Sequence, residues 1–133
     1  MAKGDDIQER LVSFAVQIIN LSSKLPKTLS GKHIAGQILR SGTAPAPNYG
    51  EARSAESSND FIHKLKIALK ELNETKVWLE IIRLSEMISA VECSEIQKSC
   101  DELCRIISAS VRTTLRGKKQ GSIINNQLLI PNY

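Results

Sequence analysis

The sequence predicts an all-α protein: an antiparallel up-down four-helix bundle whose second helix is kinked at Pro45/Pro47. Two stretches repeat apolar residues at alternating steps of four and three, which places one side chain per helical turn on a single stripe. The first consists of Ile7, Leu11, Phe14, Ile18, Leu21 and Leu25. The second consists of Phe61, Leu65, Ala68, Leu72, Thr75, Leu79 and Ile82. No β pattern or internal repeat competes, and the short connections favour antiparallel neighbours.

Length and charge limit the function classes only loosely. A chain of 133 residues with 4% aromatic residues is about one domain with a mainly aliphatic core. The net charge of +4 and a pI near 9.1 are mildly basic. Such a charge permits contact with nucleic acid but does not demand it.

The cysteines and the apolar runs bear on the compartment. An odd number of cysteines, three, favours a reducing compartment over a disulfide framework. The first six residues are polar and predict no signal peptide. No apolar run approaches the roughly 20 residues that span a membrane. We expect a cytoplasmic protein.

The first two helices are expected on either side of a proline. The first begins at Asp5 or Asp6, either of which can cap free amide groups, and it ends near Lys24 before Pro26. The second begins with Ser30 as its N-cap. Small residues and prolines at 41–48 predict a kink, because interior prolines remove backbone hydrogen bonds. A second helical piece then follows over about 47–53.

The third and fourth helices form the second half of the bundle. The third starts after Ser57 or Ser58 and reaches about Met87. The fourth starts at a capping box, Ser94 to Gln97, and Gly117 is its expected C-terminal stop. The four-helix bundle therefore spans residues 1–117. Residues 118–133 form a C-terminal tail that is flexible or docks on a neighbour.

The residues that could carry catalysis do not form a complete set. Asp60 and His63 lie one helical turn apart, but a di-metal bundle needs that pair twice, with further carboxylates. Cys100 and Cys104 share a helix face and are more simply core residues. Nucleophile elbows, phosphate loops and dinucleotide fingerprints are absent. We expect no catalytic residue, no metal and no cofactor, so the protein is expected not to be an enzyme.

Two other sets of residues suggest surfaces for partners. The candidate nucleic-acid-binding residues occur without an intervening acidic residue: Arg105, Arg112, Arg116, Lys118 and Lys119. They either solvate a helix end or contact phosphate, and oligomerisation would strengthen their combined field. The candidate oligomer contacts lie off the main stripe of the third helix: Ile67, Trp78 and Ile81.

Two segments carry a family resemblance: QILRSGTAPAPNYGEA at 37–52 and DFIHKLKIALKELNET at 60–75. They resemble the small bacterial four helix bundle protein family. That family includes proteins encoded within intervening sequences of 23S rRNA genes and is related to accessory variability proteins of diversity-generating retroelements. The resemblance covers about residues 6–117. The family motif maps onto Gln37, Arg40, Ser41, Asn48, Gly50, Glu51, Phe61 and Glu71.

The resemblance implies an antiparallel bundle that assembles as a homopentamer, and nucleic-acid binding in the retroelement branch. It also implies a reverse transcriptase or other nucleic-acid enzyme as a partner. This chain differs in being less basic and in carrying both Pro45 and Pro47. We expect the motif residues to be structural, with Arg40 and Glu51 pairing with Glu71 or Glu74.

Three functions follow from these observations. The first is a non-enzymatic, self-assembling bundle that binds RNA, DNA or a nucleic-acid enzyme through its basic surface. The second is a protein–protein scaffold without nucleic-acid binding. The third is a metal-dependent bundle enzyme built on Asp60 and His63.

Overall fold

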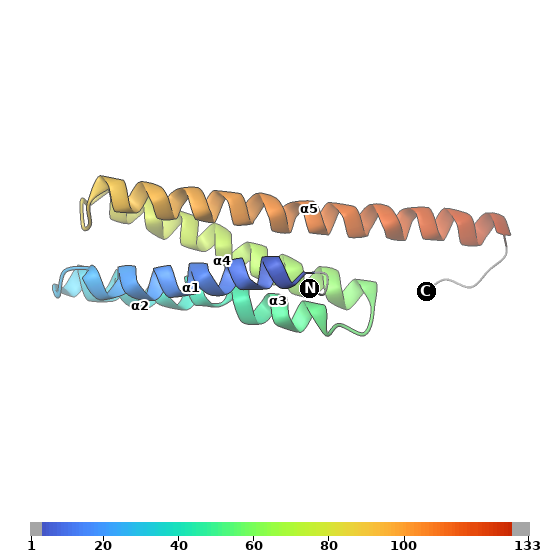
Figure 1. The fold of residues 1–133 in the computed structure, drawn as a ribbon, viewed down its shortest axis with the longest axis horizontal. Helices are drawn as coiled ribbons and strands as arrows, with labels where there is room; N and C mark the ends of the chain where they lie inside the picture. Colours follow the sequence, from blue (N-terminus) through green and yellow to red (C-terminus); the bar gives the residue numbers. More distant parts are fainter. Residues whose placement is uncertain (1–3, 129–133) are drawn as a thin grey trace.

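The computed structural model describes residues 4–128, with the side chains of residues 4–119, and every secondary-structure element in this range is helical. The elements are α1 (Asp5–Lys24), α2 (Leu29–Thr43), α3 (Pro45–Arg53), α4 (Ser58–Leu84) and α5 (Ala90–Leu128). Figure 1 shows them as long rods lying side by side. Because α2 and α3 are two parts of one bent rod, the predicted four-helix bundle is confirmed.

The bend between α2 and α3 lies at Ala44 and Pro45. Ala44 keeps helical backbone angles, and Pro45 is the first residue of α3. Proline is tolerated there, because backbone N–H groups in the first turn of a helix have no intrahelical acceptor, so the N–H that proline lacks is not missed. The side-chain amide of Asn48 donates to the carbonyl oxygen of Ala44 at 2.9 Å, which braces the bend. Pro47 falls within the same first turn, so the kink is predicted correctly although α3 starts two residues earlier.

The packing order places α1 and α4 at opposite corners of the bundle. α1 packs on α2, α3 and α5, whereas α4 packs on α5, α3 and α2. Among the described residues, α1 and α4 do not meet. α1 touches α5 much less than α4 does, so the side of the bundle between α1 and α5 is its most open side.

The two predicted stripes supply the α1 and α4 sides of the core, and buried residues of α2, α3 and α5 complete it. Leu11, Phe14 and Ile18 of α1 are almost completely buried, as are Leu65 and Leu72 of α4. Ile7 and Phe61 are only partly buried, because each stands at the end of its stripe. None of the described helices is long and apolar enough to cross a membrane.

The caps of α1 and α2 differ from those expected, whereas the starts of α1 and α4 agree with the prediction. α1 is capped by Gly4, in a left-handed conformation with φ 91°, and Asp5 and Asp6 lie in the first turn instead. There their charge still suits the helix dipole. α2 is capped by Thr28, whose hydroxyl accepts from the amide of Gly31 at 3.1 Å, so the expectation of Ser30 is wrong. At α4 the expected Ser57 cap is confirmed, with Asp60 N–H donating at 3.1 Å.

The turn between α4 and α5 is tighter than predicted. α4 ends at Leu84, and Glu86 takes a left-handed φ of 55°. The amide of Met87 donates to the carbonyl of Ile82 at 3.2 Å, the bond that closes a Schellman motif. α5 then starts at Ala90, with Ser89 Oγ accepting from Glu92 N–H at 3.2 Å. The expected cap at Ser94 is wrong, because the earlier start adds a turn that buries Cys93.

The expected stop at Gly117 is also wrong, since α5 continues to Leu128. A Cβ added at Gly117 would meet no atom within 4 Å, and this glycine has no positive φ. Such a glycine weakens a helix by about 1 kcal/mol but does not end it. Residues 129–133 lie outside the described range, so the flexible or docking tail stays a prediction.

Candidate nucleic-acid interface

Four of the five predicted cations form a line on α5. Arg105, Arg112, Arg116 and Lys119 are all exposed, and their spacings of seven, four and three residues place them on one helix face. We call this set the basic stripe. Along the axis it spans about 21 Å, at 1.5 Å per residue. No acidic residue follows Glu102 in the sequence, so no carboxylate side chain of α5 lies among the positive charges of the stripe.

The structure does not bring Lys118 to the basic stripe. Lys118 is half-buried and its ammonium group contacts Asn59 Oδ1 at the start of α4. One position along a helix turns a side chain by about 100°, which explains why neighbouring Lys119 and Lys118 face different ways. Lys118 thus ties α5 to α4.

The cations of the basic stripe differ from most others in lacking carboxylate partners. None of the ion pairs found among residues 4–119 involves Arg105, Arg112, Arg116 or Lys119. Within this range, seven other cations have carboxylate partners, among them Arg10 with Glu102 at 2.7 Å and Lys76 with Asp101 at 3.1 Å. Some lysines outside the stripe, such as Lys66 and Lys70, also have no ion pair among the described residues, but they lie on α4. The positive charges of the stripe therefore form no ion pairs that hold the helices together.

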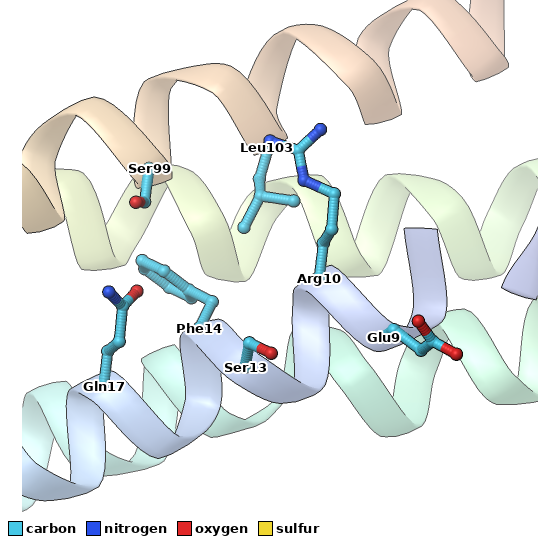
Figure 2. Close-up of a pocket in the computed structure, with 7 residues that line it drawn as sticks. All are labelled: Glu9, Arg10, Ser13, Phe14, Gln17, Ser99 and Leu103. Atoms are coloured by element: carbon cyan, nitrogen blue, oxygen red, sulfur yellow. The ribbon is translucent and has the colours of Figure 1, made fainter. Parts of the chain in front are cut away.

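The groove between α1 and α5 is a second candidate site (Figure 2). It encloses about 350 Å³ and is lined by Glu9, Arg10, Ser13, Phe14, Gln17, Ser99 and Leu103. Phe14 and Leu103 form an apolar floor, and hydroxyl and amide groups line the sides. The lining holds one carboxylate and one guanidinium but no histidine or cysteine. The arrangement can hold a polar ligand, but it presents no nucleophile beside a base.

Residues of the family motif connect α2, α3 and α4. Arg40 Nη1 lies 3.0 Å from Glu71 Oε2, and its other terminal nitrogen contacts Glu74, so this predicted pairing is confirmed. Glu51 pairs instead with Lys64 at 3.1 Å, because a carboxylate cannot attract Glu71 or Glu74. The remaining motif positions hold the bend or the core, or lie half-buried between helices: Gln37, Ser41, Asn48, Gly50 and Phe61.

Of the three predicted oligomer contacts, Trp78 already has partners within the chain. The indole N–H of Trp78 donates to Glu74 at 3.1 Å, and its ring meets His33 edge-on with centroids 6.2 Å apart. Trp78 and Ile67 are half-buried. Ile81 is also half-buried, but it lies beside exposed apolar residues.

The structure has two apolar stripes at its surface, and sequence reasoning identified only one of their residues, Ile81, as a candidate contact. The α1 stripe consists of Val12, Val16 and Ile19, and the α4 stripe of Val77, Ile81 and Leu84. Val16 is 50% exposed and Val77 is 59% exposed. In each stripe the spacing of three and four residues was visible in the sequence. The signal was hidden by the stronger core stripe on the other side of the same helix.

The potential metal and thiol ligands do not assemble a site. Among the described residues, no group of three His, Cys, Asp or Glu side chains is close enough to hold a metal ion. All three cysteines are buried and free. Cys93 Sγ and Cys100 Sγ lie 3.5 and 3.4 Å from carbonyl oxygens of α4. A hydrogen bond from Cys100 lowers the pKa of the Cys104 thiol, and the same bond raises the pKa of Cys100.

Comparisons with known proteins point to one family. The family described as 23S rRNA-intervening sequence protein matches residues 5–109. A similar solved structure is a protein with unknown function from the S23 ribosomal protein family of Bacteroides thetaiotaomicron VPI-5482. It is 37% identical with a TM-score of 0.75, over 79% of this chain and 97% of that chain. No curated protein matches the chain. The family match ends before Arg112, so three of the four stripe cations lie beyond it.

Proposed function

The chain belongs to the family of 23S rRNA-intervening sequence proteins, and we propose that it is a non-enzymatic, self-assembling bundle that binds RNA or DNA through the basic stripe of α5. One observation carries this proposal: four exposed cations share a helix face without carboxylate partners. Cations so placed are free to contact phosphates. A nucleic-acid enzyme, such as a reverse transcriptase, is a further partner for the same surface.

The spacing of the stripe suits a polyanion better than a single small anion. Its cations are distributed over about 21 Å of a straight helix, a length that several successive phosphates occupy. Each cation that neutralises a phosphate releases condensed counterions, so binding weakens linearly on a log–log plot against salt. Such contacts position the nucleic acid without reading its sequence.

Self-assembly would multiply this modest charge. The α1 stripe and the α4 stripe face away from each other, because α1 and α4 occupy opposite corners of the bundle. Two different apolar surfaces on opposite sides support a head-to-tail contact between copies, which closes into a ring when the rotation allows. A homopentamer, as the family resemblance implies, would present five basic stripes.

Binding is tested by fluorescence anisotropy with a labelled 30-nucleotide RNA and a DNA of the same sequence, between 50 and 200 mM salt. For Arg112→Gln/Arg116→Gln we expect an affinity at least about tenfold weaker, and a salt slope shallower by about 1.4 for each copy that contacts the single-stranded probe. The matched control is Lys66→Gln/Lys70→Gln on α4, which removes the same charge from exposed positions. Equal weakening by both variants, or no binding at 50 mM salt, would contradict the proposal.

Assembly is tested by sedimentation of the wild-type chain, Val16→Lys and Val77→Lys. A lysine in either apolar stripe has to lose its hydration at the contact, so we expect both variants to sediment as protomers. An equimolar mixture should form a dimer, because each variant keeps one intact stripe and together they make one good contact. A monomeric wild-type chain, or variants that assemble normally, would refute this interface.

The exposed apolar stripes also favour the second function, a protein–protein scaffold. The anisotropy and sedimentation experiments described above distinguish the two functions. Assembly that disappears with Val16→Lys, together with no anisotropy change on adding RNA or DNA, would leave the scaffold as the function.

A further inference from the structure

A second groove opens where α5 passes the start of α1. It encloses about 570 Å³, and its walls come from α1, α3, α4 and α5. Its apolar side is formed by Ile7, Tyr49 and Phe61, and its α5 side by the small residues Ser110, Thr113 and Thr114. Arg53 also lines the groove, and its charge is paired with Asp5 at 2.6 Å. We call it the end groove. Its volume falls in the range of grooves that hold several side chains of a ligand.

The end groove exposes the unfinished end of the core. Leu11 and Leu65 are 1% and 0% exposed, whereas Ile7 and Phe61, one turn further along the same stripes, remain partly exposed. Covering them would complete both stripes. Ser110 and Thr114 donate their hydroxyl hydrogens to the carbonyl oxygens of Ile106 and Ser110, at 3.2 and 2.8 Å. Their hydroxyl oxygens can still accept hydrogen bonds from the backbone N–H groups of an extended segment. The groove thus fits an extended, apolar, uncharged peptide.

The chain carries such a segment directly after α5, where residues 129–131 have the sequence Leu-Ile-Pro. Residues 120–133 contain no charged side chain. Pro131 restricts the residue before it to extended backbone, which suits a groove rather than a helix. Residues 129–133 follow α5, which ends at Leu128.

The same chain cannot place this segment in its own end groove while α5 is intact. Along the helix axis, Thr114 lies about 21 Å before Leu128, at 1.5 Å per residue. Five residues, fully extended, reach at most about 17 Å. The segment therefore falls short of even the nearest wall residue of its own groove. A neighbouring copy has no such limit.

We propose that residues 129–133 of one copy occupy the end groove of a neighbouring copy. This inference rests on the proposed self-assembly and adds a strap between adjacent copies. It is compatible with nucleic-acid binding, because Arg112 lies two residues from Ser110 and Thr114, and side chains two positions apart point to nearly opposite sides of a helix.

Disulfide trapping in the full chain tests the strap. Ser110→Cys and Ile130→Cys chains carrying different tags are co-expressed, and the purified assembly is oxidised with diamide. We expect a linked heterodimer that neither variant gives alone, since the native cysteines are buried. The matched control replaces Ser110→Cys with Asn20→Cys, an exposed position near the other end of α1, and should give no link. Adding Thr113→Trp to the Ser110→Cys chain fills the groove and should reduce the link severalfold.

Three outcomes would overturn the strap. They are no link in the mixture, an equal link with Asn20→Cys, and a link confined within one chain that carries both Ser110→Cys and Ile130→Cys. The native mass, measured before oxidation, separates this result from the proposed function. An assembled oligomer without the link removes the strap alone, whereas a monomeric wild-type chain removes self-assembly and the strap together.

Discussion

Replacing Gly42 with Ala is expected to lower the free energy of unfolding by up to about 2 kcal/mol, although the same exchange strengthens most helices. A Cβ at this position would lie 2.7 Å from Cγ1 and Cγ2 of Ile18, far inside van der Waals contact. Ile18 is fully buried and cannot move aside. Overpacking of this kind costs about 1–3 kcal/mol, against a gain of about 1 kcal/mol in helix propensity.

Gly36 supplies the matched control within the same helix. A Cβ there would meet no atom within 4 Å, so Gly36→Ala should raise the free energy of unfolding by up to about 1 kcal/mol. Urea denaturation of both variants checks the prediction. Adding Ile18→Ala to Gly42→Ala should cost less than the two single changes together, because it removes the clash. Equal effects at Gly36 and Gly42 would mean that α1 and α2 do not pack as closely as described.

Replacing Thr75 with Val is expected to destabilise the bundle by about 1–3 kcal/mol, because it strips a buried hydroxyl of its partner. Thr75 Oγ1 lies 2.9 Å from Ser41 Oγ and 2.8 Å from the carbonyl oxygen of Glu71. Both side chains are fully buried. Without Thr75, Ser41 retains one long contact of 3.5 Å to the carbonyl oxygen of Ile38. Thermal or urea unfolding measures the loss.

The double variant Ser41→Ala/Thr75→Val should recover most of that stability, since it leaves no buried hydroxyl unsatisfied. Thr75→Ser separates the hydrogen bond from packing, because it keeps the hydroxyl and removes one methyl group. A double variant as unstable as the sum of the single variants would show that the Ser41–Thr75 contact does not couple α2 to α4.

The regular parts of the fold could be predicted from the sequence. The core stripes of α1 and α4 and the kink before α3 follow from local periodicity and from proline chemistry. The ends of the helices were harder to predict, because several residues near each end can act as caps. Ser94 and Gln97 form a plausible capping box, yet Ser89 starts α5 earlier, since the added turn buries Cys93 against α4. Gly117 likewise reads as a stop, but nothing in the tertiary structure requires the helix to end there.

The candidate interface could be predicted from the sequence only in part. The sequence identified the cations of the basic stripe, because their run lacks acidic residues. It placed Lys118 among them, whereas helical rotation turns this side chain toward Asn59. It also selected Trp78 as a contact between copies, although Glu74 and His33 already engage that ring. Apart from Ile81, the residues of the α1 stripe and the α4 stripe were not identified, since an apolar residue in a helix is assigned to the core unless its surroundings are known.

By itself, the sequence determined that this chain forms helices with an apolar stripe, that one of them bends at a proline pair, and that the segment from Arg105 to Lys119 carries positive charge without acidic residues. These are properties of neighbouring residues, and the period of the helix converts them directly into faces. Only the tertiary structure decided which cations remain unpaired, which apolar residues stay exposed, and where the grooves lie. Each of those properties depends on which side chain of another helix lies opposite a given residue. The order of residues along the chain does not state which residues of different helices come close together in space.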